Sequence, residues 1–437
     1  MNYSPIIDFI RGLYPNRDFI PLHEPYFGGN EKKYLTDCID STFVSSVGKY
    51  VDRFEEMIRD FTGAKYAIAT VNGTAALHAA LKLAGVGHGD LVITHPLTFI
   101  ATCNAISYCG AESVFVDIDR KTLGLSADAL EAWLKDNVEE GFMGLEGLEG
   151  LEGLEGLEGL GGLEGGTQLS QPSQLSQLSK QRSSKLSQQR SAQPVTIHKA
   201  TGKRISACVP MHTFGHPCEI DRIVDICTRY HIPVVEDSAE SIGSYYKGQH
   251  TGTFGKLGVL SFNGNKTITT GGGGMILTND DELGKLAKHI TTTAKVPHPW
   301  RFEHDMVGFN YRLPNVNAAI GCAQMEKLPE ILENKRSTAR AYQDFFAGID
   351  GIDYAAEPKD TVSNYWLNVI LLNSLEERES FLQQTNDNKV MTRPAWILMN
   401  ELEMFKESLT GDLSISNEVA DRLVNIPSSV RGNHASI

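Results

Sequence analysis

A chain of 437 residues is long enough for a large α/β domain and a smaller one, which excludes a minimal binding module. Its 54 acidic residues outnumber its 40 basic ones, and the formal charge of -14 repels DNA and anionic membrane surfaces. An anionic substrate would need local positive groups.

The cysteines and the amino terminus indicate in which cellular compartment the protein is found. No C-x-x-C pair and no His-flanked zinc spacing occurs, so we predict no metal site. The chain begins without a basic region followed by an apolar one, and no run of about 18 apolar residues occurs, so we predict neither a signal peptide nor a membrane span. Scattered cysteines of odd number favour a reduced, cytoplasmic protein. They are Cys38, Cys103, Cys109, Cys208, Cys218, Cys227 and Cys322.

An alternation of strands and helices begins near residue 65. Hydrophobic periodicity predicts strands at 65–70, 91–94 and 113–116, with helices at 74–84 and 99–108 between them. This order is typical of a mostly parallel sheet covered by helices.

The alternation stops after a helix predicted at 126–137, which opens with a capping serine. Residues 141–166 repeat Gly-Leu-Glu, and 167–194 are rich in Ser and Gln. Such composition cannot bury enough apolar surface to offset chain entropy, so we predict that 141–194 is a disordered surface insertion. The alternative is an interaction arm, because the first part carries six Glu and the second carries Lys and Arg.

The alternation resumes at residue 204, so the insertion interrupts a single large domain, predicted at 1–325. Beyond it, a helical stretch, a strand at 365–372 and a helix at 375–384 predict a small α+β domain at 326–437. We expect the active site at the junction of the two domains. The resumed elements are a strand at 204–209, a helix at 221–230 and strands at 233–236, 259–262 and 275–278.

The segment from Pro233 to Met275 carries the most chemistry. Pyridoxal phosphate (PLP) catalysis needs a lysine that forms an imine, an acid that keeps the pyridine nitrogen protonated, and donors for the phosphate. Lys266, Asp237 and Ser261 fit these roles. Asp237 follows a predicted strand, where ligands gather, whereas Glu236 falls inside it. Taken singly, such an Asp is more often a helix cap and such a Lys a surface charge.

The segment, and nearly all of the chain outside 141–194, resembles the DegT/DnrJ/EryC1/StrS family of PLP-dependent sugar aminotransferases. The resemblance includes Asn72–Leu77, and it implies that the N–H groups of Gly73 and Thr74 bind the PLP phosphate. A helix amino terminus offers unpaired donors and a positive dipole for this purpose, although alone it would be an ordinary capped helix. The resemblance also implies that Phe99, otherwise a core residue, stacks on the pyridine ring.

A second motif, Gly308–Leu313, is similar to the family's Gly-x-Asn-x-Arg-Leu signature. It implies that Asn310 reaches the phosphate of a neighbouring subunit, hence a homodimer with shared active sites. Arg312 and Arg393 are candidate substrate-binding residues, because arginine holds carboxylate or phosphate with two N–H groups; a structural ion pair is the alternative. Glu240 stands where most of the family has Gln and is carried over as a cofactor-binding residue.

Four histidines are candidate acid–base groups. No two lie at metal-ligand spacing with an acid, and the lysine released from PLP suffices for proton transfer, so we expect packing or substrate contact. They are His212, His216, His298 and His304.

The resemblance implies the type I PLP-dependent transferase fold, similar to aspartate aminotransferase, with a large seven-stranded mixed-sheet domain and a small C-terminal domain. Residue patterns alone support only α/β. The implied activity passes an amino group from a donor, typically glutamate, through PLP to a nucleotide-linked keto sugar, in amino-sugar biosynthesis for cell-surface polysaccharides.

Runs such as CVPMHTFGHP and NYWLNVILLN look most like the legionaminic and bacillosamine branch. That likeness implies a UDP-linked 4-keto-6-deoxy-2-acetamido sugar, aminated at C4. The alternatives are GDP-linked perosamine synthesis, a 3-keto substrate, or a non-catalytic PLP-fold regulator. A dehydratase offshoot of the family has histidine in place of the lysine, and Lys266 argues against it.

Overall fold

The computed structural model describes residues 2–143 and 193–432. At its centre lies a mixed sheet with the strand order β1-β11-β10-β7-β6-β2-β3, in which β6 and β7 are joined by a parallel bridge between Cys208 and Val234. In this order β11 runs antiparallel to both of its neighbours, β1 and β10, and the other neighbouring pairs are parallel. The expected mixed seven-stranded sheet is therefore present. Its strands are β1 (Tyr66–Thr70), β2 (Leu91–Thr94), β3 (Glu112–Phe115), β6 (Arg204–Cys208), β7 (Val235–Asp237), β10 (Leu257–Ser261) and β11 (Gly274–Thr278).

Side chains of the sheet alternate between two apolar layers, because successive residues of a strand point to opposite faces. Val92 and Val259 face α4, α5 and α9. Leu91 and Ile93 face α6 and α8, and Leu260 faces α3 and α10. Since both faces are covered, the strands carry apolar side chains on both. The helices are α3 (Lys49–Thr62), α4 (Gly73–Leu83), α5 (Ile100–Tyr108), α6 (Ala127–Asn137), α8 (Ile220–Arg229), α9 (Asp281–Thr291) and α10 (Asn315–Phe346).

The ends of the predicted insertion are part of the fold. Strand β4 (Val138–Met143) pairs antiparallel with β5 (Gln193–His198), which in turn pairs with the first residues of β6. The prediction that 141–194 lies outside regular structure is therefore wrong for 141–143 and 193–194, and the alternation resumes at 193 rather than 204. Strand pairing across this long connection explains the difference, since local composition does not report it. The rest of that prediction concerns residues 144–192, which lie outside the described residues.

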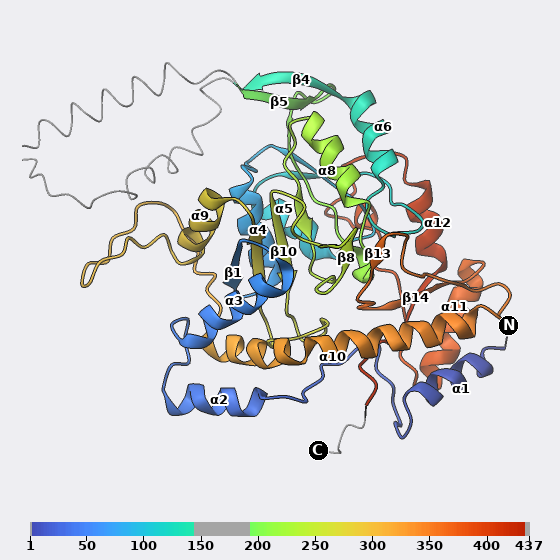
Figure 1. The fold of residues 1–437 in the computed structure, drawn as a ribbon. Helices are drawn as coiled ribbons and strands as arrows, with labels where there is room; N and C mark the ends of the chain where they lie inside the picture. Colours follow the sequence, from blue (N-terminus) through green and yellow to red (C-terminus); the bar gives the residue numbers. More distant parts are fainter. Residues whose placement is uncertain (1, 144–192, 433–437) are drawn as a thin grey trace, which may run out of the picture.

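Helix α10 spans 32 residues and runs along one side of the molecule (Figure 1). Its first half packs with α2 (Glu31–Asp40) and α3, and its second half packs Tyr342 and Phe346 against Ile6 and Ile10 of α1 (Ser4–Leu13). The boundary predicted at 325 falls inside this helix, and the amino-terminal residues pack with the carboxyl-terminal part. The division into two domains stays a prediction, with α10 shared between the halves.

The carboxyl-terminal part contains a second sheet, ordered β12-β14-β17-β15. One segment of this part also returns to the large sheet, where β16 pairs parallel with β3. No helix of the described residues is long and apolar enough to cross a membrane. The remaining elements are β8 (Tyr245–Tyr246), β9 (Gln249–His250), β12 (Asp353–Tyr354), β13 (Thr361–Val362), β14 (Asn368–Leu371), α11 (Leu375–Asp387), β15 (Arg393–Pro394), β16 (Leu409–Thr410), α12 (Ser414–Arg422), β17 (Leu423–Ile426) and the 3-10 turns Thr213–Gly215 and Met399–Glu401.

Candidate active site

A cavity of about 300 Å³ lies where β7 and β10 end and α4 begins. The carboxyl ends of parallel strands and a helix amino terminus meet there, which is where open α/β sheets bind ligands. Most of the residues predicted to form the site line this cavity. They are Gly73, Thr74, Phe99, Asp237, Glu240, Ser261 and Lys266.

The start of α4 forms one wall of the cavity. Asn72 caps the helix, its side-chain oxygen accepting from the N–H of Ala75 at 2.7 Å. The first-turn N–H groups of Gly73 and Thr74 have no acceptor within the helix, so they are available to an anion. A Cβ at Gly73 would lie 2.8 Å from the Cβ of Ser261, so only glycine allows this close approach. The helix amino terminus and the Ser261 hydroxyl thus converge on one place.

Asp237 forms the floor at the end of β7 and is 4% exposed. One carboxylate oxygen accepts from the hydroxyl of Thr102 at 2.7 Å, and the other accepts from the N–H of Ala239 at 3.1 Å. Each oxygen of the carboxylate therefore has a donor, and the group lines the cavity where a positively charged ring nitrogen would find a partner.

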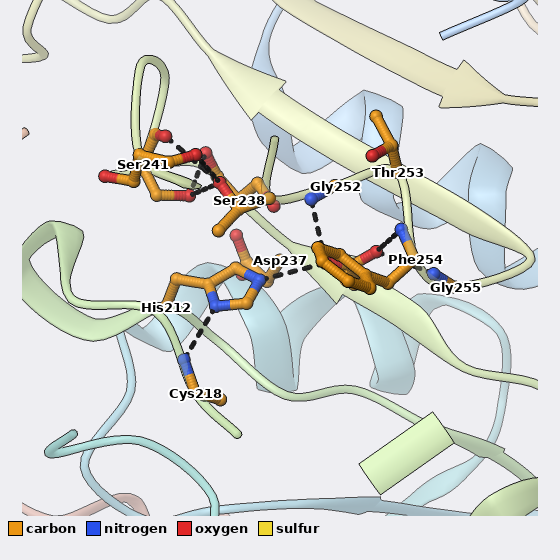
Figure 2. A network of polar contacts seen from close by, with 12 residues as sticks. His212, Cys218, Asp237, Ser238, Ser241, Gly252, Thr253, Phe254 and Gly255 are labelled. Carbon is orange, nitrogen blue, oxygen red and sulfur yellow. Dashed lines mark hydrogen bonds and ion pairs between the residues drawn. The ribbon is translucent and has the colours of Figure 1, made fainter. Parts of the chain in front are cut away.

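The neighbouring Glu236 is committed to a different network. It is fully buried outside the cavity lining and accepts from His212 Nε2 at 3.0 Å and from the N–H groups of Gly252, Phe254 and Gly255 at 2.7–2.8 Å. Figure 2 shows His212 on one side of this network and the loop with Gly252, Phe254 and Gly255 on the other. The four donors leave Glu236 no role in the cavity, and His212 lies within the network rather than in the site.

Lys266 is 9% exposed, and its amino group lies 3.2 Å from Glu240 Oε1. The same amino group lies 4.0 Å from the centre of the Trp366 ring. The second oxygen of Glu240 accepts from the N–H of Phe214 at 2.9 Å. Burial raises the pKa of Glu240 to about 6, although the charge of Lys266 lowers it.

The raised pKa of Glu240 gives a measurable pH dependence of stability. The folded pKa of about 6 exceeds the ordinary 4.5, so the folded state holds the proton more tightly, and the contribution of Glu240 to stability falls as pH rises from 4.5 to 6. In urea unfolding of the cofactor-free protein, the wild type should lose about 2 kcal/mol relative to Glu240→Gln between a pH well below 4.5 and a pH well above 6.

The matched control is Glu357→Gln, which removes a carboxylate whose pKa is lowered, against burial, by its bonds to Arg336. There the wild type should gain relative stability as pH rises toward 4.5 and change little between pH 4.5 and 6, because the folded pKa lies below 4.5. If the difference in stability between the wild type and Glu240→Gln did not change with pH, the pKa of the Glu240 carboxyl group would not be raised by folding.

Three predicted residues do not reach the cavity of the same chain. The guanidinium of Arg312 donates to the side-chain oxygen of Asn310 at 3.1 and 3.2 Å. Arg393 donates to the side-chain oxygen of Asn386 and to the carbonyl oxygen of Thr392. Within one subunit, therefore, the cavity is not lined by Asn310, Arg312 or Arg393.

The cavity also contains residues that the sequence did not suggest. Met211, Trp366 and Trp396 line it, and the Trp396 ring lies 5.9 Å from that of Phe99 and 5.1 Å from that of Phe214. Both tryptophans come long after β11, the last of the seven strands along the chain, so local pattern gave no signal for them. In the described residues no group of His, Cys, Asp and Glu could hold a metal ion.

Comparison with known proteins gives a consistent assignment. The model of the DegT/DnrJ/EryC1/StrS aminotransferase family matches residues 25–139 and 187–437. The GDP-perosamine synthase of Escherichia coli O157:H7 is 32% identical over 94% of this chain and 93% of its own length. The putative pyridoxal phosphate-dependent aminotransferase EpsN of Bacillus subtilis (strain 168) is 31% identical over 89% of this chain and 84% of its own length.

Two solved structures share the fold. The aminotransferase TlmJ from Streptoalloteichus hindustanus superposes with a TM-score of 0.74 at 23% identity, and PseC of Helicobacter pylori, involved in pseudoaminic acid biosynthesis, with 0.74 at 20% identity. Each pair covers 94% of this chain and 93% of the other. The expected type I PLP-dependent transferase fold is confirmed, whereas the legionaminic and bacillosamine branch stays a prediction.

Proposed function

Because the chain belongs to the DegT/DnrJ/EryC1/StrS aminotransferase family, we propose that it moves an amino group from glutamate to C4 of a nucleotide-linked keto sugar. The family uses PLP, and the protein is a PLP-dependent aminotransferase. The observation that carries the site assignment is that Lys266, Asp237, Ser261 and the start of α4 line one cavity.

The residues of the cavity fit PLP. The start of α4 and the Ser261 hydroxyl would hold the phosphate, Asp237 would pair with the ring nitrogen, and Phe99, which is 46% exposed, would lie on the ring face. When bound, PLP supplies an electron sink for the pair of electrons freed at the carbon that bears the amino group.

Lys266 serves as the attachment point and as the proton carrier in this proposal. Released from the cofactor by the incoming amine, it takes the proton from Cα and returns it on the other side of the reaction. Glu240 would hold the amino group of Lys266 in the cavity through their 3.2 Å contact. Asp237 keeps the ring nitrogen charged, so it strengthens the electron sink.

Two nucleotides are candidates for the substrate. Sequence runs such as NYWLNVILLN favour a UDP-linked 4-keto-6-deoxy-2-acetamido sugar. The specific observation for a GDP-linked sugar is that GDP-perosamine synthases are among the relatives at 30–32% identity. Incubation of the PLP-loaded enzyme with glutamate and each 4-keto sugar, followed by mass spectrometry of the product, decides between them. Turnover of neither sugar, with PLP bound, would contradict the proposed substrate class.

We further propose a cytoplasmic homodimer with shared sites. The segment before Asn310 carries exposed apolar side chains, with Trp300, Phe302 and Val307 at 76%, 83% and 91% exposure. Figure 1 shows this segment after α9 as an extended arm. A second subunit would cover such a surface and receive Asn310. The cysteines of the described residues are all buried and free, which fits a reducing compartment.

The shared site predicts complementation between two inactive variants. Lys266→Ala lacks the attachment point, and Asn310→Ala lacks a phosphate contact donated to the partner. After subunit exchange, one of the two sites in a mixed dimer would have both functional residues, so activity should recover to about a quarter of the wild-type value at an equal mixture. Exchange demonstrated by labelled subunits, without recovery of activity, would contradict a site shared in this way.

A further inference from the structure

The amino group of Lys266 has a second partner besides Glu240. The face of the Trp366 ring lies 4.0 Å from Lys266 Nζ, and Trp366 is only 4% exposed. The negative face of an indole attracts an ammonium group, most strongly where water is excluded. The lysine thus lies between a carboxylate and an aromatic face.

Trp366 is fixed in this position by bonds at both of its ends. The indole N–H donates to the carbonyl oxygen of Asn265, next to Lys266, at 2.7 Å. The main-chain N–H donates to the side-chain oxygen of Asn364 at 2.8 Å. Between them Tyr365 has a φ of 47°, a conformation that costs energy for a residue other than glycine. A strained turn with satisfied bonds therefore presents the ring.

Asn364 links this turn to the other partner of the lysine. Its side-chain NH2 donates to the carbonyl oxygens of Glu240 and Ile242 at 2.9 Å each, and to the hydroxyl of Thr267 at 3.2 Å. Asn364 is fully buried. One side chain thus joins the turn of Glu240, the loop of Lys266 and the turn of Trp366.

We infer that Trp366 is a positioning residue for Lys266, which together with Glu240 holds the amino group whenever it is not bonded to the cofactor. The inference rests on the proposed role of Lys266. When a donor amine takes its place, two hydrogens pass from the donor nitrogen to Lys266 Nζ, which leaves as a neutral amine. Lys266 then accepts the Cα proton as an ammonium, which the ring and the carboxylate both stabilise.

The first test compares a variant without an aromatic ring at position 366 with a variant that keeps one. Trp366→Leu removes the aromatic face and should lower kcat about 10-fold while the KM for glutamate changes little. Trp366→Phe keeps a face and should retain most of the activity, although it loses the bond to Asn265. Because proton transfer is impaired, the kinetic isotope effect with glutamate deuterated at Cα should rise in Trp366→Leu and not in Trp366→Phe.

A second test leaves the volume of the side chain unchanged. The chain has four tryptophans, so growth on fluorinated tryptophan weakens the ring face at all of them. In the wild-type background the isotope effect should rise with the number of fluorine atoms. In the Trp366→Phe background, where Trp133, Trp300 and Trp396 are still replaced, it should not.

A readout without turnover uses the cofactor-free protein. Acetylation of Lys266, followed by mass spectrometry over a range of pH, reports how much of the amino group is unprotonated. The titratable groups around it are Glu240 and Asp237 in the cavity, Lys335 of α10, which donates to the main-chain oxygen of Trp366, and His23, whose pKa is lowered by burial. Fluorination should move the labelling midpoint of Lys266 to lower pH, and it should not do so in Trp366→Phe.

Equal isotope effects and labelling midpoints in all fluorinated and unfluorinated proteins would overturn the inference, as would equal losses in Trp366→Leu and Trp366→Phe. Failure of the proposed function is recognised separately. Borohydride treatment of the wild-type PLP enzyme should trap the cofactor on the peptide that contains Lys266, and a label elsewhere would reject the role of Lys266 itself.

Discussion

Lys266→Ala is expected to abolish transamination, with a loss of at least about 10⁴-fold in kcat, while the protein still folds. In the proposed mechanism the lysine supplies the covalent attachment and the proton transfer, so the variant would have no group to carry Cα chemistry. Loss of the absorbance band of PLP bound to lysine, and loss of the borohydride-trapped adduct, are the direct measurements.

The matched control for that variant is Lys266→Arg. A guanidinium keeps a positive charge beside Glu240 and Trp366, so it preserves the ion pair and the ring contact while removing the reactive amine. Both variants should be equally inactive, and Lys266→Arg should be the more stable. A borohydride-reducible adduct that persists in either variant would mean that another residue holds the cofactor.

Asp237→Asn is expected to reduce kcat by about 10²- to 10⁴-fold with a small change in stability. The amide can keep the bond from the N–H of Ala239 and accommodate the rotating hydroxyl of Thr102, so the local geometry survives. It cannot hold the charge on the ring nitrogen, and the electron sink weakens. Steady-state rates of each half-reaction test this expectation.

The control for Asp237 is another buried aspartate at the end of a strand. Asp117 accepts from the N–H groups of Ile415 and Ser416, where it caps α12, and it does not line the cavity. Asp117→Asn should lower thermal stability and leave kcat close to that of the wild type. If instead Asp237→Asn retained a near-normal rate, a different acid would have to serve the ring nitrogen.

Sequence reasoning succeeds where local pattern and chemistry coincide. The apolar runs of β1, β2 and β10 and the cap at Asn72 follow from residues a few positions apart, and the lysine, acid and serine stand within one short segment. Asp237 differed only in being the last residue of β7 rather than the first one after it.

Other features depend on partners that are distant in the chain. Trp366 and Trp396 enter the cavity because the carboxyl-terminal part folds back over the large sheet, and no local periodicity encodes that return. The pairing of β4 with β5 joins residues on either side of a long connection. Asn310 stays a prediction, because its proposed contact requires a second chain.

The sharing of α10 between two apolar clusters bears on how the chain can be divided. Leu328 and Ile331 lie in the cluster of the large sheet, and Tyr342 and Phe346 lie in the cluster that also contains Ile10 of α1. A cut at residue 325 would leave each product with an exposed apolar surface that the other should cover. The two halves should therefore unfold together, and neither is suited to exchange with another protein as an independent evolutionary unit.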